Sequence, residues 1–240
     1  MLVDRKVMIE HLAKVAVNGQ ITEAVFTGAF ECRALTTDGQ LMVLAPALKD
    51  VEPLTEDVGC TNLAKLQGAL KSLVGDNAKV AIEFVDERIR LEQRHGGWIH
   101  LATALPKLIQ SHVQPDTVKK VLAAIPKKPV EVALSQVVVQ TVLEAASIVK
   151  PEAITLKVEK SGGTLVLGQD TGDQAGIALP IKLAKGEEPY ELRFAARVLL
   201  DVFKQLSDFT SSKLTLTGPD SIAIVGEGAY RYVISPQEKA

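Results

Sequence analysis

The sequence predicts an α+β protein built from two similar, strand-rich halves with two helices each. Three observations lead to this class. Apolar residues make up 47% of the 240 residues but aromatic residues only 4%, so we expect an aliphatic core. Four of the eleven prolines lie between residues 105 and 129 and divide the chain near its middle, because proline fixes φ and lacks an N–H donor. The order of helix and strand patterns before this stretch recurs after it.

The first half begins with a helix expected over residues 5–17. A second helix is expected to start after Thr61 or Asn62, whose side chains can cap its first turn. Its apolar stripe consists of Leu63, Leu66, Leu70 and Leu73. The strands expected around these helices are 21–26, 30–35, 40–44, a short one before Cys60, 79–84, 88–93 and 98–102.

The second half opens with a strand at 130–134 and a helix that Ser135 can cap and that ends before Pro151. The apolar stripe of this helix is Val138, Val142, Ala146 and Val149. A further helix is expected over 195–206, with the stripe Leu199, Val202, Phe203 and Leu206. The expected strands are 154–158, 164–167, 175–181, 190–194, 213–217, 221–225 and 229–234. Residues 80–82 correspond to 214–216, so the repeat is 134 residues long at this point.

These patterns predict an N-terminal domain over 1–113, a connector over 114–129 and a C-terminal domain over 130–240. The connector carries four lysines and one aspartate, and its prolines should resist regular structure apart from a short amphipathic piece with Val118, Val121 and Leu122.

Composition excludes several classes of protein. The net charge of −2 rules out a globally basic nucleic-acid binder and a disordered acidic tail, but not a locally basic surface. Cys32 and Cys60 are too few for a disulfide framework or a zinc ribbon; one bridge is conceivable, and free thiols in a reducing compartment are favoured. Without a membrane-length apolar run or an apolar signal segment, we expect a cytoplasmic protein, or one of the host cytoplasm if viral.

Motifs for catalysis and cofactor binding are absent from the sequence. There is no phosphate-binding loop, no dinucleotide fingerprint and no nucleophile elbow. The histidines are His11, His95, His100 and His112, and their spacing suits no common metal site. The pairs at 96–97 and 162–163 are interpreted as glycine hairpin turns. The sequence therefore predicts no catalytic residue, no metal and no cofactor.

Several short stretches have the order and spacing of a known family. Residues 21–24 directly follow the first helix, Asn62 and 69–71 lie on the second, 194–197 begin the fourth, and 229–236 close the chain. Together they resemble the DNA sliding clamps, most nearly the two-domain clamps similar to proliferating cell nuclear antigen and those of some phages. The resemblance covers almost the whole chain.

The resemblance implies a DNA-clamp fold in which two helices per domain form one layer and antiparallel sheets the other. Domains of this family join head to tail into a ring with helices around the hole. Two domains per chain imply a homotrimer that encircles double-stranded DNA without reading its sequence. Such a ring is no enzyme; it is placed by a clamp loader and tethers a DNA polymerase, which keeps the enzyme at a high effective concentration.

The resemblance also implies which residues contact DNA. Lys71, Arg197 and Lys204 match the family pattern, and Lys14 and Lys65 lie on the corresponding helices. Lysine and arginine on such surfaces would attract phosphates through a diffuse, salt-sensitive field. The alternative is that they are ordinary solvated charges on amphipathic helices.

The predicted basic surface departs from the family in one place. The helix at 135–149 has no lysine or arginine, and Glu10 and Asp201 interrupt the basic faces of two others. We therefore expect a weak inner field and weak DNA binding by the free protein.

Two apolar stretches, 98–105 and 175–181, match the edge strands through which clamp subunits pair. The interface residues that this implies are Trp98, Ile99, Leu101, Ile177 and Leu179. An apolar edge strand left uncovered is an aggregation hazard, which subunit pairing removes. The alternative is that both stretches are buried central strands, and the sequence does not decide between the two.

Partners of this family insert an apolar peptide into a groove beneath the connector. The positions that match this groove are Met42, Leu44, Val121, Leu122, Ile125, Val233, Ile234 and Pro236. The alternative for the connector members is that they only attach the connector to the sheet.

Two other functions stay open on the sequence alone. A duplicated α+β protein that binds or converts a small molecule would need a deep pocket with converging polar groups. A scaffold subunit that never touches DNA would tolerate loss of the helix lysines and arginines.

Overall fold

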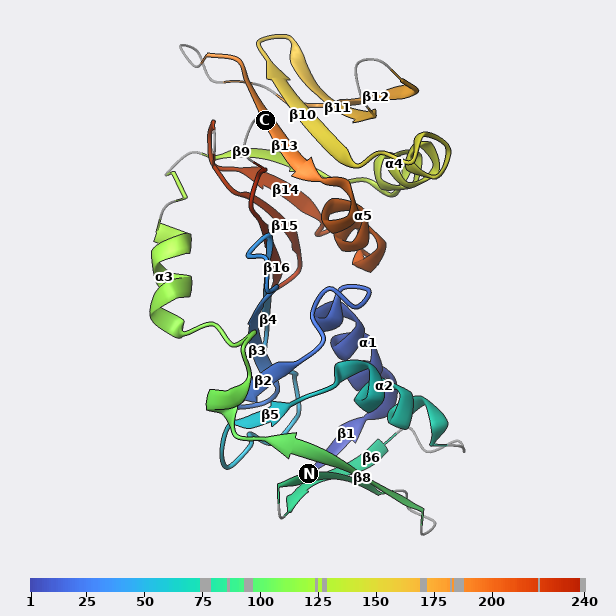
Figure 1. The fold of residues 1–240 in the computed structure, drawn as a ribbon, viewed down its shortest axis with the longest axis vertical. Coiled ribbons are helices and arrows are strands. Elements are labelled where there is room, and N and C mark those ends of the chain that lie inside the picture. Colours follow the sequence, from blue (N-terminus) through green and yellow to red (C-terminus); the bar gives the residue numbers. More distant parts are fainter. Residues whose placement is uncertain are drawn as a thin grey trace. The chain divides into compact units, whose positions relative to one another are not determined.

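The computed structural model describes residues 1–73, 79–85, 87–92, 97–123, 125–126, 129–168, 172–181, 183, 188–219 and 221–237. The chain forms two compact units (Figure 1). The first comprises Met1–Thr37 and Val43–Gln114, and the second comprises Asp38–Met42 and Pro115–Ala240.

The first unit contains two helices and a set of antiparallel strands. Its elements are β1 (Leu2–Asp4), α1 (Arg5–Ala16), β2 (Ala24–Thr27), β3 (Glu31–Leu35), β4 (Leu41–Ala45), β5 (Val58–Cys60), α2 (Leu63–Ser72), β6 (Lys79–Val85), β7 (Arg88–Glu92), β8 (Trp98–Ala104) and a 3-10 turn, η1 (Pro106–Leu108). The strand order is β1-β6-β7-β8-β5-β2-β3-β4, in which the first two residues of β4, Leu41 and Met42, belong to the second unit. Figure 1 shows α1 and α2 together on one side of these strands.

The second unit begins with α3 (Pro115–Ala123) and continues with the same kinds of element. They are β9 (Val130–Ala133), α4 (Gln136–Val149), β10 (Ala153–Glu159), β11 (Gly162–Gly168), β12 (Gln174–Leu179), β13 (Tyr190–Ala195), α5 (Ala196–Gln205), β14 (Lys213–Leu216), β15 (Ala223–Glu227) and β16 (Tyr230–Ile234). The strands are ordered β12-β11-β10-β13 and β16-β15-β14-β9.

The two units repeat one topology element by element. From β1 to β8 and from β9 to β16, the order is strand, helix, four strands, helix, three strands. The pairing repeats as well, because β1 pairs with β6 and β9 with β14, both antiparallel. The predicted α+β class with two helices per repeat is confirmed. The strand β1 was not predicted, since three residues are too few to show a period.

Side-chain caps explain where three of the helices start. Asp4 accepts hydrogen bonds from the Lys6 and Val7 N–H groups at the start of α1. Asn62 caps α2, and Ser135 caps α4, as predicted. Such caps satisfy N–H groups that have no partner within the helix and contribute about 1 kcal/mol each.

The helices pack aliphatic stripes against the sheets, as the sequence predicts. In α2 the whole predicted stripe is buried, from Leu63 to Leu73. In α4 the buried residues are Val139, Val142 and Ala146. The buried stripe therefore begins one residue later than the predicted stripe, which began at Val138. Val138 and Val149 are only half-buried.

The connector is more regular than the prolines suggested. Pro115 begins α3, a position where its missing N–H costs nothing because the first N–H groups of a helix lack partners. Val118 is buried and fixes one side of this helix. The amphipathic piece expected around Val118, Val121 and Leu122 is present as α3, but it is longer than those residues and extends from Pro115 to Ala123. Lys127 and Lys128 lie outside the described residues.

The predicted glycine turn in the second unit is also wrong. Glu159 pairs with Gly162 across the hairpin, so Lys160 and Ser161 form the turn and both glycines belong to β11. A Cβ atom at Gly163 would come within 2.3 Å of Ile181 Cδ1. The glycine therefore serves close packing rather than the turn. Of the other predicted turn, Gly96 lies outside the described residues.

Cys32 and Cys60 are both buried and free, as favoured by the sequence. No helix in the described part of the chain is long and apolar enough to cross a membrane. Within the same residues, no cluster of three or more histidine, cysteine, aspartate or glutamate side chains could hold a metal ion.

Candidate nucleic-acid interface and assembly edges

The helices of the first unit carry three of the five predicted DNA-binding residues. Helices α1 and α2 pack side by side, and the Gln67 side chain donates a hydrogen bond to the Ile9 carbonyl at 3.2 Å. Lys65 and Lys71 are exposed on α2, whereas Lys14 on α1 is half-buried. The three lysines therefore belong to one pair of packed helices.

The other two predicted residues lie on α5 in the second unit. Arg197 and Lys204 are exposed and seven residues apart, so they share the solvent face of this helix. Lys204 forms an ion pair with Asp201 at 3.0 Å. Because the Asp201 side chain is only 8% exposed, this pair is partly shielded from water, and the charge of Lys204 is partly neutralised.

Buried Glu227 holds the end of α5 in place. Its Oε1 atom accepts hydrogen bonds from the Ser207 and Asp208 N–H groups at 2.9 and 2.6 Å. Charged hydrogen bonds in a dry site are stronger than neutral ones. Glu227 therefore anchors the loop after α5 to β15 and orients the helix that carries Arg197.

The solvent face of α4 carries no cation, as the sequence predicts. Its exposed residues are Gln136, Val137, Gln140, Thr141, Glu144, Ser147 and Ile148. Val137 and Ile148 are 72% and 77% exposed, the highest values among the large apolar side chains described. This helix can contribute contact surface but no direct attraction for phosphate.

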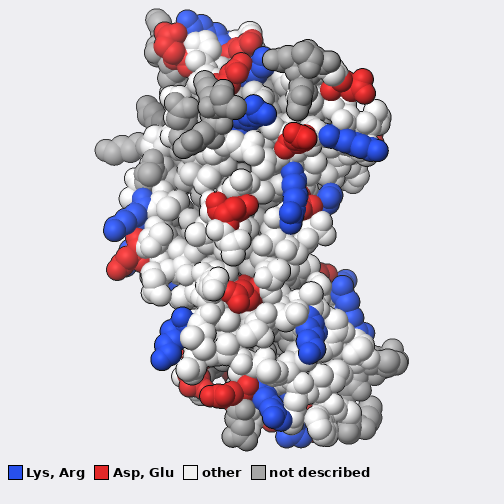
Figure 2. All heavy atoms as spheres, viewed as in Figure 1, with Lys and Arg blue, Asp and Glu red and all other residues white. Residues whose placement is uncertain are grey.

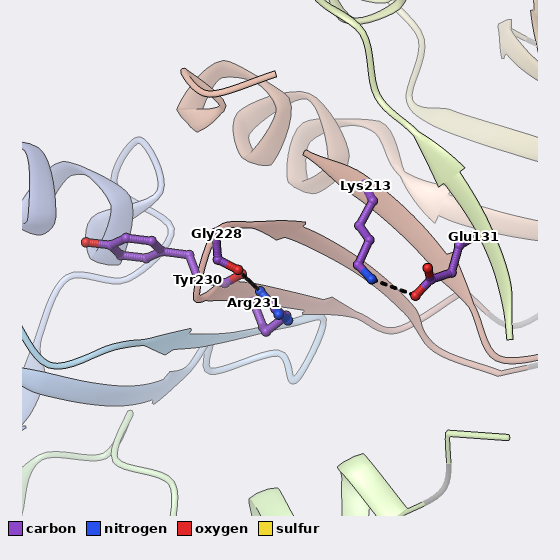
Figure 3. Close-up of polar contacts among 5 residues, drawn as sticks. All are labelled: Glu131, Lys213, Gly228, Tyr230 and Arg231. Atoms are coloured by element: carbon purple, nitrogen blue, oxygen red, sulfur yellow. Dashed lines mark hydrogen bonds and ion pairs between the residues drawn. The ribbon is translucent and has the colours of Figure 1, made fainter. Parts of the chain in front are cut away.

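Several cations on the sheet faces already have carboxylate or carbonyl partners. Figure 3 shows Lys213 of β14 turned toward Glu131 of β9, with 2.7 Å between Nζ and Oε1. The Arg231 guanidinium donates to the Gly228 and Tyr230 carbonyls at 2.6 and 2.7 Å. Arg33, Arg90 and Lys157 also lie in ion pairs.

The helix cations differ from these sheet cations. Within the described residues, Lys65, Lys71 and Arg197 have no ion-pair partner. Exposed Lys160, in the turn between β10 and β11, shares this property. Figure 2 shows Lys and Arg side chains distributed over the face in view, interspersed with Asp and Glu and separated by uncharged residues. Such separated charges produce a diffuse field that salt screens over about 8–10 Å.

The second predicted edge, β12, ends the sheet β12-β11-β10-β13 (Figure 1). Gln174–Leu179 pairs with β11 on one side, and no described strand pairs on the other. Ile177 and Leu179 are 9% and 4% exposed, and β12 contacts α4. The strand has a free backbone edge, but its two predicted interface side chains face the core.

The first predicted edge, β8, is an edge for only part of its length. Thr103 and Ala104 pair with β5, so the expectation of an edge strand over all of 98–105 is wrong at its end. Residues from Trp98 to Ala102 pair with β7 alone within the described chain. Trp98 is 58% exposed, and Ile99 and Leu101 are half-buried.

The predicted peptide-groove residues have very different exposures. Met42, Val233 and Ile234 are at most 7% exposed. Leu44, Val121, Ile125 and Pro236 are half-buried, and Leu122 is 39% exposed. The structure thus presents Leu122 to solvent and covers Met42, Val233 and Ile234. Sequence reasoning missed Leu108 on η1, which is 63% exposed, because a single leucine in a proline-rich stretch shows no period.

One buried histidine has a strongly shifted pKa. His11 of α1 is 1% exposed, and its Nε2–H donates to the Phe30 carbonyl at 2.8 Å. Burial disfavours the charged imidazolium and lowers the pKa of His11 to about 4. His11 is therefore a neutral part of the core at pH 7, as the sequence interpretation of packing or surface histidines allows.

Comparisons with known proteins identify the fold. No family model and no curated protein matches this sequence. The structure resembles a Caulobacter crescentus beta sliding clamp with a TM-score of 0.69 and 20% identity, over 100% of this chain and 66% of that one. It resembles the PCNA of A. fulgidus, solved with the C-terminal region of FEN-1 bound, with a TM-score of 0.69 and 14% identity, over 100% and 98% of the chains.

The PCNA of Thermococcus kodakaraensis matches equally well, with a TM-score of 0.69 and 14% identity over 99% of both chains. This chain spans about two thirds of the length of the Caulobacter clamp and nearly the full length of the two PCNA chains. These likenesses, with the repeated topology, show that the chain has the sliding-clamp fold.

Proposed function

We propose that this protein is a sliding clamp, which encircles duplex DNA as a ring and tethers a replicative DNA polymerase. The observation that carries the proposal is the repeat of one ten-element topology in both units, together with a likeness to A. fulgidus PCNA over 98% of that chain. In this assignment, residues 1–113 and 130–240 are the two clamp domains and 114–129 is the connector between them.

The ring would be a homotrimer closed by strand pairing between copies. In the repeat, β8 corresponds to β16 and β12 to β4. Inside the second unit, the Ser235 N–H after β16 donates to the Gln40 carbonyl before β4 at 3.0 Å. Because β16 and β4 are neighbours and β8 and β12 occupy their positions in the repeat, this contact supports pairing of β8 in one copy with β12 in the next. Such a contact is heterologous and closes into a ring when its rotation allows.

DNA would contact the helix faces of this ring. Lys65, Lys71 and Arg197 are available for phosphates, with Lys14 and Lys204 contributing less because one is half-buried and the other is paired. The uncharged face of α4 keeps the total attraction low. A weak, non-specific field suits a protein that must slide, since tight phosphate contacts would resist movement.

The polymerase and the clamp loader would bind through apolar peptides near the connector. Val121, Leu122, Ile125 and Pro236 offer apolar surface there. Met42, Leu44, Val233 and Ile234 belong to the same proposed groove. Leu44 is half-buried, whereas Met42, Val233 and Ile234 are buried and offer little surface to a peptide. The lysines of α3 would attract acidic residues that flank such a peptide.

A topological experiment tests the proposed ring directly. After loading by the cognate loader, or after opening and reclosing in its absence, the protein should stay on nicked circular DNA in high salt and leave when a restriction enzyme linearises the DNA. The mass of the free protein should be three times 25.8 kDa. Equal retention on circular and linear DNA in high salt would overturn encirclement, and a protein that stays monomeric would overturn the homotrimer.

A further inference from the structure

The free part of β8 carries an exposed aromatic pair. Trp98 is the only tryptophan of the chain and is 58% exposed. Its ring lies against that of exposed His100, with 4.4 Å between centroids and 37° between planes. The two residues are two positions apart on one strand, so their side chains stand on the same face of the sheet. A packed but uncovered pair of this size is typical of the centre of an interface.

The free strand β12 has the opposite character. On its exposed face it carries Gln174, Gly176 and Ala178, so two successive positions bear almost no side chain. The nearest atom to a Cβ built on Gly176 is Thr164 Cγ2, at 3.6 Å. Val166 and Thr164 of β11 pair with these two positions and are half-buried. Together the four residues form a shallow apolar shelf, which we call the β12 shelf (Thr164, Val166, Gly176 and Ala178).

The two exposed faces lie on the same side when the strands pair. Ile177 and Leu179 point away from the β12 shelf into the core that α4 covers. On β8, half-buried Ile99 and Leu101 point away from Trp98 and His100. In a continuous sheet, the helices of both copies cover the same face. If β8 pairs with β12, Trp98 and His100 therefore stand on the same face of the joined sheet as the β12 shelf.

We propose that Trp98 and His100 of one copy cover the β12 shelf of the next copy and form the energetic centre of the contact between copies. This inference rests on the proposed ring and names the residues that select its partner, a second copy of this chain. Large aromatic rings fit closely over glycine and alanine. Two surfaces that both carried large side chains, or both small ones, would not fit together in this way. The contact is directional, because the aromatic pair and the shelf belong to different strands.

The single tryptophan provides a direct measurement. When the full-length protein is diluted, the emission maximum of Trp98 should move to longer wavelength and its quenching by acrylamide should rise. Both changes should follow the loss of trimer mass in sedimentation velocity. A protein that assembles while Trp98 stays as accessible as in the monomer would overturn this inference and leave the ring intact. A protein that is monomeric at every concentration would overturn the ring and this inference with it.

Two substitutions test the two sides of the contact. Trp98→Ala should weaken self-association at least tenfold, as expected for loss of a central aromatic residue. Gly176→Val should do the same while retaining the tryptophan signal. Valine suits an exposed strand position, and a Cβ on Gly176 makes only an ordinary van der Waals contact, with Thr164 Cγ2 at 3.6 Å, so the folded monomer should be unaffected. Circular dichroism of each variant below its dissociation concentration verifies the fold.

Val85→Ala is the matched control. Val85 lies on β6 of the same sheet and is 50% exposed, but it is away from the free edge of β8. Its substitution should leave both the dissociation constant and the Trp98 emission unchanged. Assembly that tolerates Trp98→Ala and Gly176→Val as well as it tolerates Val85→Ala would overturn the inference.

Discussion

Arg197 and Lys204 lie on one face of α5 but differ in what surrounds their charges. Arg197 is unpaired among the described residues, whereas Lys204 is held at 3.0 Å from the shielded Asp201 carboxylate. An ion pair already formed within the protein leaves less charge to exchange for condensed cations on DNA. If the protein binds DNA as proposed, two residues with equal formal charge should contribute unequally to that binding.

Arg197→Ala should therefore lower the slope of log affinity against log salt by about 0.9, the value for one phosphate contact. Lys204→Ala should lower it by clearly less. Fluorescence anisotropy with a short duplex between 50 and 200 mM salt measures both slopes. Lys160→Ala removes an exposed charge from a hairpin turn on a sheet and should leave the slope unchanged. Equal slopes for all three variants would contradict a role for the helix face.

Burial of His11 makes stability depend on pH. Its pKa falls from 6.5 to about 4 in the folded protein, so between these values the unfolded chain binds more protons than the folded one. The free energy of unfolding must therefore decrease as pH falls through this range. The stabilisation by neutral His11 is fully present above pH 6.5 and is lost toward pH 4.

Chemical denaturation should show this loss as a decrease of about 2 kcal/mol in unfolding free energy between pH 7 and pH 5 that His11→Gln removes. Glutamine keeps an N–H donor for the Phe30 carbonyl but does not titrate in this range. The quantity to compare is the difference between wild type and variant, since other groups titrate identically in both. A pH dependence that survives the substitution would show that His11 is not its source.

At the scale of elements, packing of the β10–β11 hairpin depends more on Gly163 than on the adjacent Gly162. A Cβ on Gly163 would meet the buried Ile181 side chain at 2.3 Å, whereas a Cβ on Gly162 finds only the Leu179 carbonyl, at 3.9 Å. Overpacking of this kind typically costs about 1–3 kcal/mol. The two positions are adjacent on one strand and provide a natural pair of variants.

Gly163→Ala should accordingly lower the free energy of unfolding by about 1–3 kcal/mol, measured by urea denaturation. Gly162→Ala should stay within about 0.5 kcal/mol of the wild type, as surface substitutions usually do. If the two alanine variants were equally stable, Ile181 would have to move freely, and the packing described for this edge of the sheet would be wrong.

The whole molecule is predicted to be stabilised by its copies. If three chains pair through β8 and β12, mass action adds about 1 kcal/mol per chain for each tenfold rise in concentration. For a chain of this size, that corresponds to a rise of about 2–3 °C in the thermal midpoint. Differential scanning calorimetry from micromolar to hundred-micromolar protein measures it. A midpoint independent of concentration would contradict an assembly linked to folding.

Much of the fold was predictable because it depends on local pattern. The stripe of α2 and the caps Asn62 and Ser135 follow from residues a few positions apart. The tandem repeat is visible for the same reason, since the same order of helix and strand patterns occurs twice in the sequence. The turn at Lys160 and Ser161 was mispredicted because glycine is common in turns, and only the position of Ile181 reveals its other use.

By itself, the sequence determined the class of fold, the two repeats and the charges that each helix can present, because period, caps and composition are properties of neighbouring residues. Only the tertiary structure decided which of those charges are available and which strands have free edges. Pairing of Lys204 with Asp201, burial of Val233 and Ile234 and the contrast between Trp98 and the β12 shelf all depend on residues brought together by packing. Burial and pairing are set by partners that are distant in the chain, and no local pattern contains them.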